Sequence, residues 1–270
     1  MDGGLSMKRL IPILLVILFI SSCKPTWVRE LEDKNPLKND TNMVSVYFRF
    51  DTIINDFEVS GILYPKHDKV RGWSGYENGG RLFFHSLKTG KEYTWTDRYE
   101  EPQCCQWSFM SKNVYDIYFA EGFDGFHNGD YYIFTYDTSP RREPDNELYP
   151  NAEYQFYDVD FDGDLELLIN HYQGGPYSCT CYEIYEITDT ALVRKYPVNE
   201  PDYYCFMLDD NTKLDARNKT ISNNFYSGCC AWGTFFYQVD DKSDIHAVYS
   251  VHHHWDTKRE DVISDTTFIQ

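Results

Sequence analysis

The sequence has few basic residues and no apolar run long enough to cross a bilayer. Its 270 residues include 25 Lys and Arg against 43 Asp and Glu, which gives a net charge of −18 at pH 7. A surface this acidic disfavours nucleic acid as a partner and attracts cations and basic proteins. The apolar stretch at residues 10–20 is shorter than the ~20 residues that a membrane-spanning helix needs.

Motifs that mark common enzyme classes are also missing. The sequence contains no Gly-rich phosphate loop, no nucleophile elbow and no zinc-protease motif. A Cys/His hydrolase would need the fold to bring a thiol, an imidazole and an orienting group together, and no spacing in the sequence indicates this. We therefore expect a protein that is not an enzyme, with a Cys/His hydrolase as the weakest alternative.

What the N-terminus does contain is an export signal. Met7-Lys8-Arg9 is followed by the apolar run and by Ser21-Ser22-Cys23, the layout of a signal peptide over residues 1–22. Ile20-Ser21-Ser22-Cys23 resembles a lipobox, which implies cleavage before Cys23 and lipidation of its sulfur with diacylglycerol, followed by further acylation with chains such as palmitate. We expect a lipid anchor in the bacterial cell envelope, best placed in the outer membrane. An ordinary secretory signal with an incidental cysteine is the alternative.

The mature chain is rich in aromatic residues and in short alternating runs. It follows a polar stretch at residues 23–42, which we interpret as the lipidated cysteine and a flexible tether. The 23 Tyr, 18 Phe and 6 Trp favour strands, and Thr89-Gly90 and His127-Asn128-Gly129-Asp130 are hairpin signals. Residues 43–270 are therefore predicted to form a single all-β domain, an antiparallel two-sheet β-sandwich. The predicted strands are residues 44–50, 57–64, 81–87, 92–96, 114–120, 131–136, 154–157, 165–170, 182–187, 191–196, 202–207, 234–239 and 245–251.

One motif has chemical specificity, the acidic run at residues 158–166. Asp158, Asp160 and Asp162 alternate, Gly163 permits a sharp turn, Asp164 can offer its backbone carbonyl, and Glu166 follows. Calcium binds six to eight oxygen ligands, and alternate carboxylates in a tight loop converge on one point. The sequence therefore predicts a structural Ca²⁺ at Asp158, Asp160, Asp162, Asp164 and Glu166, with a metal-free acidic turn as the alternative.

This loop differs from an EF-hand. Ile169 stands at the twelfth position, where an EF-hand has a bidentate Glu. Leu165, Leu167 and Ile169 alternate as in a strand rather than a helix. The loop instead resembles the short calcium loops of β proteins such as FG-GAP repeats.

Residues 154–249 resemble a group of periplasmic bacterial β-sandwich proteins with a calcium loop, whose characterised members inhibit lysozyme-like peptidoglycan hydrolases. The matching features are the calcium loop, Tyr182-Glu183-Ile184-Tyr185, Lys219-Thr220-Ile221-Ser222 leading to Gly228, and a strand with Tyr237; upstream, Arg81-Leu82-Phe83-Phe84 and Thr89-Gly90-Lys91 fit an earlier hairpin. Inhibitory relatives insert a Ser-Gly loop with a nearby tyrosine into the hydrolase cleft. The resemblance implies Tyr226, Ser227 and Gly228 as partner-binding residues, although Cys229-Cys230 follow where the tyrosine is expected, and Ser74-Gly75-Tyr76 is a weaker match.

Seven cysteines besides Cys23 are expected to form disulfides, because an exported chain meets an oxidising environment. They are Cys104, Cys105, Cys179, Cys181, Cys205, Cys229 and Cys230. An odd number leaves at least one thiol over, and the connectivity is not deducible from sequence. Cross-links between loops are expected, because neighbouring cysteines rarely bond to each other. A zinc site is disfavoured by the tight Cys179-Thr180-Cys181 spacing.

Two further groups of residues have a structural and a functional interpretation. His252-His253-His254 could place two imidazoles on one strand face for a transition metal, but we favour a solvated strand end. Aromatic side chains could form a glycan-stacking platform, or they could pack in the core, which we favour. The candidates for that platform are Trp73, Tyr76, Trp95, Trp107 and Trp232. The expected function is a membrane-anchored recognition module, with a lysozyme-like hydrolase or a glycan as its partner.

Overall fold

The computed structural model describes residues 24–41, 44–64, 79–96, 126–136, 152–173, 179–199, 206, 208–209, 212–227, 231–256 and 261–269. The chain divides into two compact units, residues 1–42 and 43–270. The boundary lies where the sequence predicts the tether to end.

The first unit contains a helix that the sequence analysis missed. Helix α2 (Thr26–Lys34) follows Pro25 and buries Val28 and Leu31. These two residues are three apart and so lie on one helix face. The stretch interpreted as the lipidated cysteine and a flexible tether, residues 23–42, thus contains a helix that the sequence did not indicate.

The second unit begins with a five-stranded sheet in the order β4-β3-β2-β1-β5. Its strands are β1 (Val46–Phe50), β2 (Phe57–Tyr64), β3 (Gly79–Ser86), β4 (Glu92–Thr96) and β5 (Tyr131–Phe134). Gly90 has φ +69 in the tight turn between β3 and β4, as the Thr89-Gly90 pair predicts. Gly129 also has a positive φ before β5. The strand expected to precede this turn, residues 114–120, lies outside the described residues, so the hairpin remains a prediction; β5 itself pairs with β1 in parallel.

The central sheet has the order β10-β8-β7-β6, with β9 also pairing with β8. Its strands are β6 (Tyr154–Tyr157), β7 (Glu166–Gln173), β8 (Cys179–Ile187), β9 (Leu192–Arg194) and β10 (Leu208–Asp209). All of its pairings are antiparallel. The acidic run at residues 158–165 is the connection between β6 and β7.

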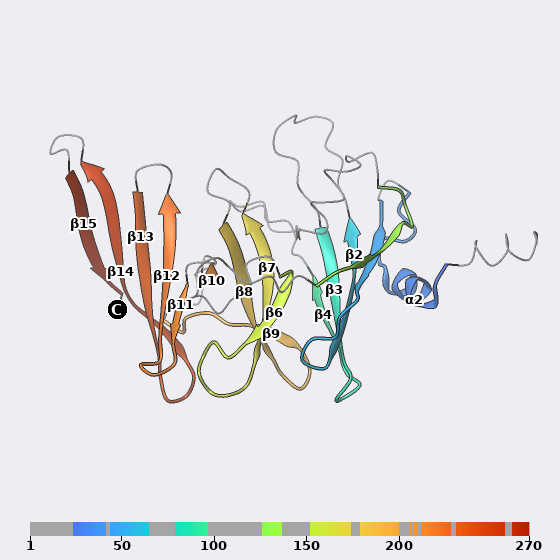
Figure 1. Ribbon diagram of the computed structural model, residues 1–270, viewed down its shortest axis with the longest axis horizontal. Helices are drawn as coiled ribbons and strands as arrows, with labels where there is room; N and C mark the ends of the chain where they lie inside the picture. Colours follow the sequence, from blue (N-terminus) through green and yellow to red (C-terminus); the bar gives the residue numbers. More distant parts are fainter. Residues whose placement is uncertain are drawn as a thin grey trace, which may run out of the picture. The chain divides into compact units, whose positions relative to one another are not determined.

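The third sheet is an antiparallel series in sequence order, β11-β12-β13-β14-β15. Its strands are β11 (Lys213–Asp215), β12 (Thr220–Ser227), β13 (Ala231–Val239), β14 (Ile245–Asp256) and β15 (Asp261–Phe268). These strands are drawn in orange and red in Figure 1. A β-bulge interrupts the β13–β14 pairing between Phe236 and Tyr237.

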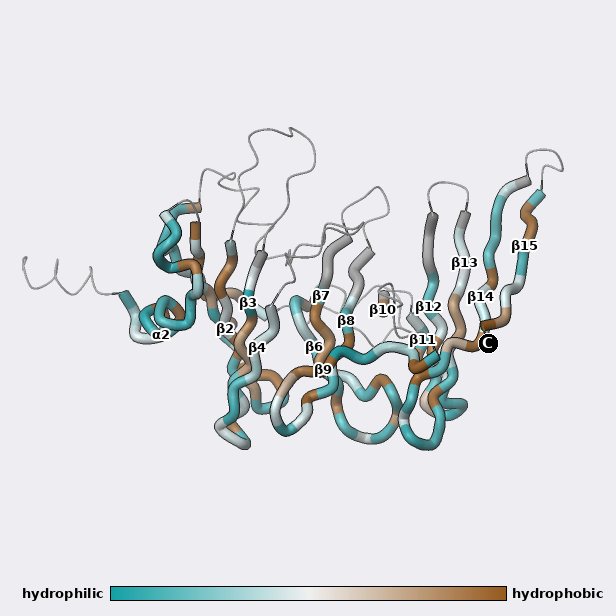
Figure 2. The backbone as a smooth tube through the Cα atoms, turned by 180° about the vertical axis from the view of Figure 1, so that it is seen from behind, coloured by the Kyte–Doolittle hydropathy of each residue, from teal (hydrophilic) through white to brown (hydrophobic). Residues whose placement is uncertain are grey.

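The central sheet is buried on both faces. Leu167 and Ile169 belong to a core shared with the first sheet, whereas Leu168, between them in sequence, belongs to a second core shared with the third sheet. Successive strand residues point to opposite faces, so a strand apolar at consecutive positions needs a partner on each side. Figure 2 shows hydrophobic stretches along β2 and β7.

Aromatic rings fill both cores. In the first, Tyr154 of the central sheet meets Phe50 and Phe84 of the first sheet at ring-centroid distances of 5.1 and 5.5 Å. In the second, Phe206 packs against Tyr237 of the third sheet at 4.8 Å. Edge-to-face pairs of this kind add about 0.5–1.5 kcal/mol to the free energy gained by burial.

The all-β, antiparallel, sandwich-like architecture is confirmed, but the described residues form three sheets where two were expected. The bounds of β2, β4 and β6 agree with the predicted strands. Four strands were missed, β10, β11, β12 and β15. Strand β15 is exposed along nearly its whole length. A strand that buries no face needs no alternation of apolar and polar residues, and this alternation is the signal by which strands are predicted. The predicted strands at 114–120 and 202–207 lie outside the described residues, apart from Phe206.

Candidate metal site

The β6–β7 hairpin holds its acidic loop in shape through backbone hydrogen bonds. The Asp158 carboxylate accepts the N–H groups of Asp162 and Gly163, each at 3.1 Å. Asp162 accepts the N–H of Asp164 at 2.8 Å. Gly163 has φ +95, in the left-handed region that favours glycine. Asp and Asn side chains commonly cap turns in this way, so the loop geometry by itself needs no metal.

Three carboxylates converge at the base of this loop. Ligand oxygens of Asp158, Asp160 and Glu166 all lie within 4.8 Å of one another. Asp160 is fully buried and Glu166 is 3 % exposed. Glu166 is positioned by strand β7 and by the Val159 N–H, which donates to its Oε2 at 2.7 Å. The part of the chain that the structure describes holds no other group of three such metal-ligating side chains.

One oxygen in the cluster has no protein partner. Asp160 Oδ1 is buried and accepts no hydrogen bond. Leaving a buried acceptor unsatisfied costs about 1–3 kcal/mol, more when the group is charged. The three carboxylates together form a group that could hold a metal ion.

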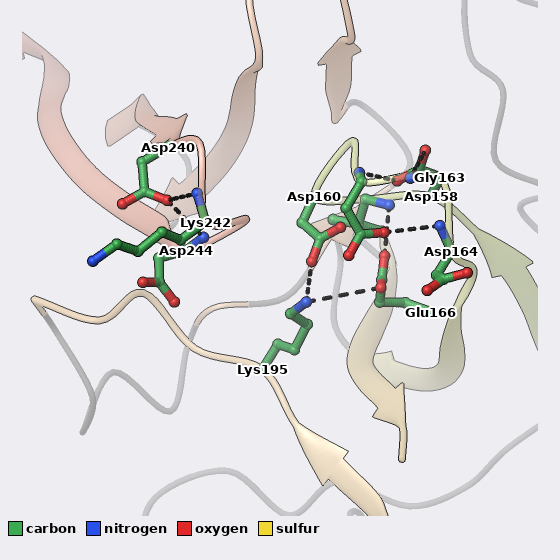
Figure 3. Close-up of polar contacts among 11 residues, drawn as sticks. Asp158, Asp160, Gly163, Asp164, Glu166, Lys195, Asp240, Lys242 and Asp244 are labelled. Carbon is green, nitrogen blue, oxygen red and sulfur yellow. Dashed lines mark hydrogen bonds and ion pairs between the residues drawn. The ribbon is translucent and has the colours of Figure 1, made fainter. Parts of the chain in front are cut away.

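A lysine from another part of the central sheet reaches the same carboxylates. Lys195, directly after β9, pairs with Asp160 Oδ2 and lies 3.8 Å from Glu166 Oε1. Figure 3 shows its ammonium group pointing at both side chains. The Lys195 N–H donates to the carbonyl of Ile184 at 2.9 Å, which fixes the backbone at this position.

Burial dominates the electrostatics of the cluster. It raises the pKa of Asp160, against the hydrogen bond from Lys195, and raises the pKa of Glu166 to about 7, against the hydrogen bond from Val159. Burial lowers the pKa of Lys195, but the hydrogen bond to Asp160 and the charge of Glu166 outweigh it, so this pKa is raised. The carboxyl pKa values are thus raised by desolvation, and the Lys195 pKa is raised by its carboxylate partners.

The structure brings together part of the predicted ligand set. Asp158, Asp160 and Glu166 form the group, whereas Asp162 and Asp164 are not members of it. Lys195 was missed, because it lies 29 residues beyond Glu166 and no local pattern links the two. Only the pairing of β9 with β8 brings it to the loop.

Several other predicted sites fall outside the described residues. These are the signal peptide and Cys23, the Ser74-Gly75-Tyr76 motif, Gly228, and Cys104, Cys105, Cys205, Cys229 and Cys230. Cys179 and Cys181 belong to β8, but their side chains are likewise not described. Tyr226 and Ser227 end β12 and pair in register with Trp232 and Ala231. The disulfides therefore remain a prediction.

Two of the five aromatic candidates and all three histidines lie among the described residues. Trp95 is buried and donates its Nε1–H to the Tyr185 hydroxyl at 2.8 Å, so it belongs to the core. Trp232 is 36 % exposed, whereas Trp73, Tyr76 and Trp107 lie outside the described residues. The three histidines lie on β14, where Nδ1 of the middle one, His253, is 2.7 Å from Ser264 Oγ of β15.

No protein family, curated protein or solved structure matches this chain. Within the described residues, no helix is long and apolar enough to span a membrane.

Proposed function

We propose that the chain is an exported, lipid-anchored binding module whose domain is stabilised by a calcium ion held by Asp158, Asp160 and Glu166. The observation that carries the metal site is the unsatisfied, fully buried Asp160 Oδ1 beside two further carboxylates. The lipid anchor rests on the sequence from Ile20 to Cys23.

Calcium suits this donor set better than other common ions. All three side chains offer carboxylate oxygens, which favour hard cations over zinc or copper. Calcium binds oxygen at about 2.3–2.6 Å, so oxygens that share one ion lie within about 5 Å of each other. The spacing of the three side chains meets this condition. The ion would join the start of β7 to the β6–β7 loop, which is a structural role.

The test is a thermal melt of the mature chain with calcium and with EGTA. For the unmodified chain, calcium is expected to raise the melting temperature, because it binds the folded state alone. Asp160→Ala is expected to abolish this rise, and Asp240→Ala, at an exposed acidic turn, to leave it intact. If millimolar calcium does not shift the melting temperature, the calcium assignment is wrong.

The lipid anchor is tested separately. Cys23→Ala is expected to abolish the membrane-bound fraction of the protein.

A hydrolase inhibitor is a second candidate function, favoured by the position of its predicted contact residues. Tyr226 and Ser227 occupy the last two positions of β12, next to the residues that connect β12 to β13. A loop at a hairpin end can enter a cleft without disturbing the sheet. The acidic chain would also attract a basic lysozyme. Turbidity assays with such a lysozyme should show inhibition that Tyr226→Ala weakens and Tyr131→Ala, on β5, does not.

A further inference from the structure

Over β12–β15, the face of the third sheet directed away from the central sheet is built from neutral and aromatic residues. Ile221, Tyr237 and Ala247 point toward the central sheet, where they join the second core. Because side chains alternate along each strand, the intervening positions point the other way. The apolar and aromatic members of this outer face, with His253, are Trp232, Phe236, Tyr249, Val251, His253, Trp255, Val262 and Phe268.

The rings on this outer face are arranged as cross-strand pairs. Phe236 and Tyr249 stack at a centroid distance of 4.4 Å, and Phe268 lies 6.0 Å from Tyr249. Trp232 and His253 stack at 5.5 Å. Several of these side chains remain open to solvent, with Trp255 47 % and Phe268 73 % exposed. A contiguous exposed aromatic surface is uncommon in proteins and marks binding sites.

Across the described positions of β12–β15 the outer face carries no Asp, Glu, Lys or Arg, although one residue in four of the chain is charged. The register of β11 with β12 places Lys213 and Asp215 at one edge of this face. Among the described positions of β12–β15, its polar members are the hydroxyls and amides of Thr220, Ser222, Asn224, Thr234, Gln238, Ser264 and Thr266, together with His246 and His253. Some are already ordered in pairs, such as Thr234 with Asn224 at 2.8 Å and His253 with Ser264 at 2.7 Å. Over the described positions of β12–β15, a charged partner would therefore find no oppositely charged Asp, Glu, Lys or Arg on this face.

We propose that this outer face binds a neutral saccharide. The flat rings offer surfaces for the C–H faces of sugar rings, and the hydroxyls and amides between them can exchange hydrogen bonds with sugar hydroxyls. A second copy of this chain is a less suitable occupant, because two molecules of net charge −18 repel each other. The inference rests on the proposed role as a binding module but does not depend on the calcium ion.

The test is a titration of the mature chain with neutral hexasaccharides of glucose, N-acetylglucosamine and xylose, followed by tryptophan fluorescence and calorimetry. At least one should bind. Trp232→Ala and Trp255→Ala should each weaken that binding about tenfold, the scale of one lost aromatic contact. Tyr131→Ala removes an equally exposed aromatic from the first sheet and should change nothing. Circular dichroism checks folding, and the exposure of Trp255 makes its variant the safer of the two.

Hexagalacturonate serves as the charge control and should bind more weakly than the neutral sugars. Absence of binding at millimolar saccharide overturns the inference, and so does binding that both tryptophan variants leave unchanged. A third outcome is self-association without sugar binding. If sedimentation equilibrium detects self-association and Trp255→Ala abolishes it, the face binds a second copy instead.

Titrations in calcium and in EGTA distinguish the saccharide proposal from the calcium proposal. Saccharide binding without any calcium-induced stabilisation would leave this inference standing and remove only the metal site.

Discussion

Two hairpins of this protein close on acidic loops built in the same way. In the β6–β7 loop, Asp158 accepts two backbone N–H groups. In the β13–β14 loop, Asp240 accepts the N–H groups of Lys242 at 2.7 Å and Asp244 at 3.1 Å. Each loop contains a residue with positive φ, Gly163 in the first and Ser243 in the second. Figure 3 shows the two loops together.

The loops differ in what lies beneath the turn. In the β13–β14 loop, the second oxygen of Asp240 meets His246 at 3.1 Å, and both side chains are 38 % exposed. In the β6–β7 loop, Asp160 and Glu166 are turned into the protein and meet Lys195. Backbone hydrogen bonding to an aspartate therefore explains the shared turn. We propose a cation only for the β6–β7 loop, because only its carboxylates are buried.

The largest expected difference between the two loops is in the free energy of unfolding that Asp160→Ala and Asp240→Ala each remove. Without calcium, Asp160→Ala should lower the free energy of unfolding by about 3 kcal/mol, because it leaves the half-buried Lys195 without its closest partner. Asp240→Ala should cost less, because its carboxylate is exposed and water can replace it. Urea denaturation in EGTA measures both. A larger loss for Asp240→Ala would contradict this account of the two loops.

Replacing Lys195 should show whether the lysine and a calcium ion compete for the same carboxylate oxygens in the β6–β7 loop. Lys195 occupies carboxylate oxygens that calcium would use, so Lys195→Gln should raise the calcium affinity about tenfold, equivalent to ~1.4 kcal/mol. The same change should lower the stability of the calcium-free protein. Calorimetric titration gives the affinity, and Lys242→Gln in the other loop is the matched control, with no expected change. An unchanged affinity would show that Lys195 does not compete with the ion.

The residues with positive φ should respond in opposite directions. Gly163→Ala should lower the free energy of unfolding by about 1 kcal/mol, because a β-carbon is strained in the left-handed region. No atom lies within 4 Å of that added carbon, so steric clash does not contribute. Ser243→Gly should raise stability by less than about 1 kcal/mol, because it relieves the same strain at φ +64. Equal effects of one sign would mean that neither turn stores this strain.

The smallest expected effect is the acid sensitivity of the β13–β14 loop. Hydrogen bonds, first from the Lys242 N–H and then from His246, lower the pKa of Asp240. A carboxyl group whose pKa is lower in the folded state stabilises the protein above its unfolded pKa of about 3.9. This stabilisation is lost as the pH falls through the folded pKa. Asp240→Asn should thus melt below the unmodified protein at pH 7 and approach it near pH 2. A gap that persists at pH 2 would assign the effect to packing.

Much of the fold was predictable because the signals are local. Strands β2, β4 and β6 alternate apolar and polar side chains or lie between turn residues, and the pairs Thr89-Gly90 and Asp162-Gly163 mark their turns. Strands β12 and β15 escaped prediction because they are rich in Ser, Asn, Thr and Asp, and β15 buries little on either face. Helix α2 escaped because two apolar residues in a polar stretch are a weak signal.

The sequence by itself determined that this is an acidic, aromatic-rich, all-β chain with one concentrated set of carboxylates after β6. Composition, alternation and a tight acidic turn are properties of neighbouring residues, and they do not depend on the rest of the chain. Only the tertiary structure decided that the sheets number three among the described residues, and that Lys195 meets Asp160. It also decided that aromatic side chains gather on the outer face of the third sheet, with the charged Lys213 and Asp215 at its β11 edge. Each of these depends on which strand pairs with which and on what covers each face, and such contacts are made by residues far apart in the sequence.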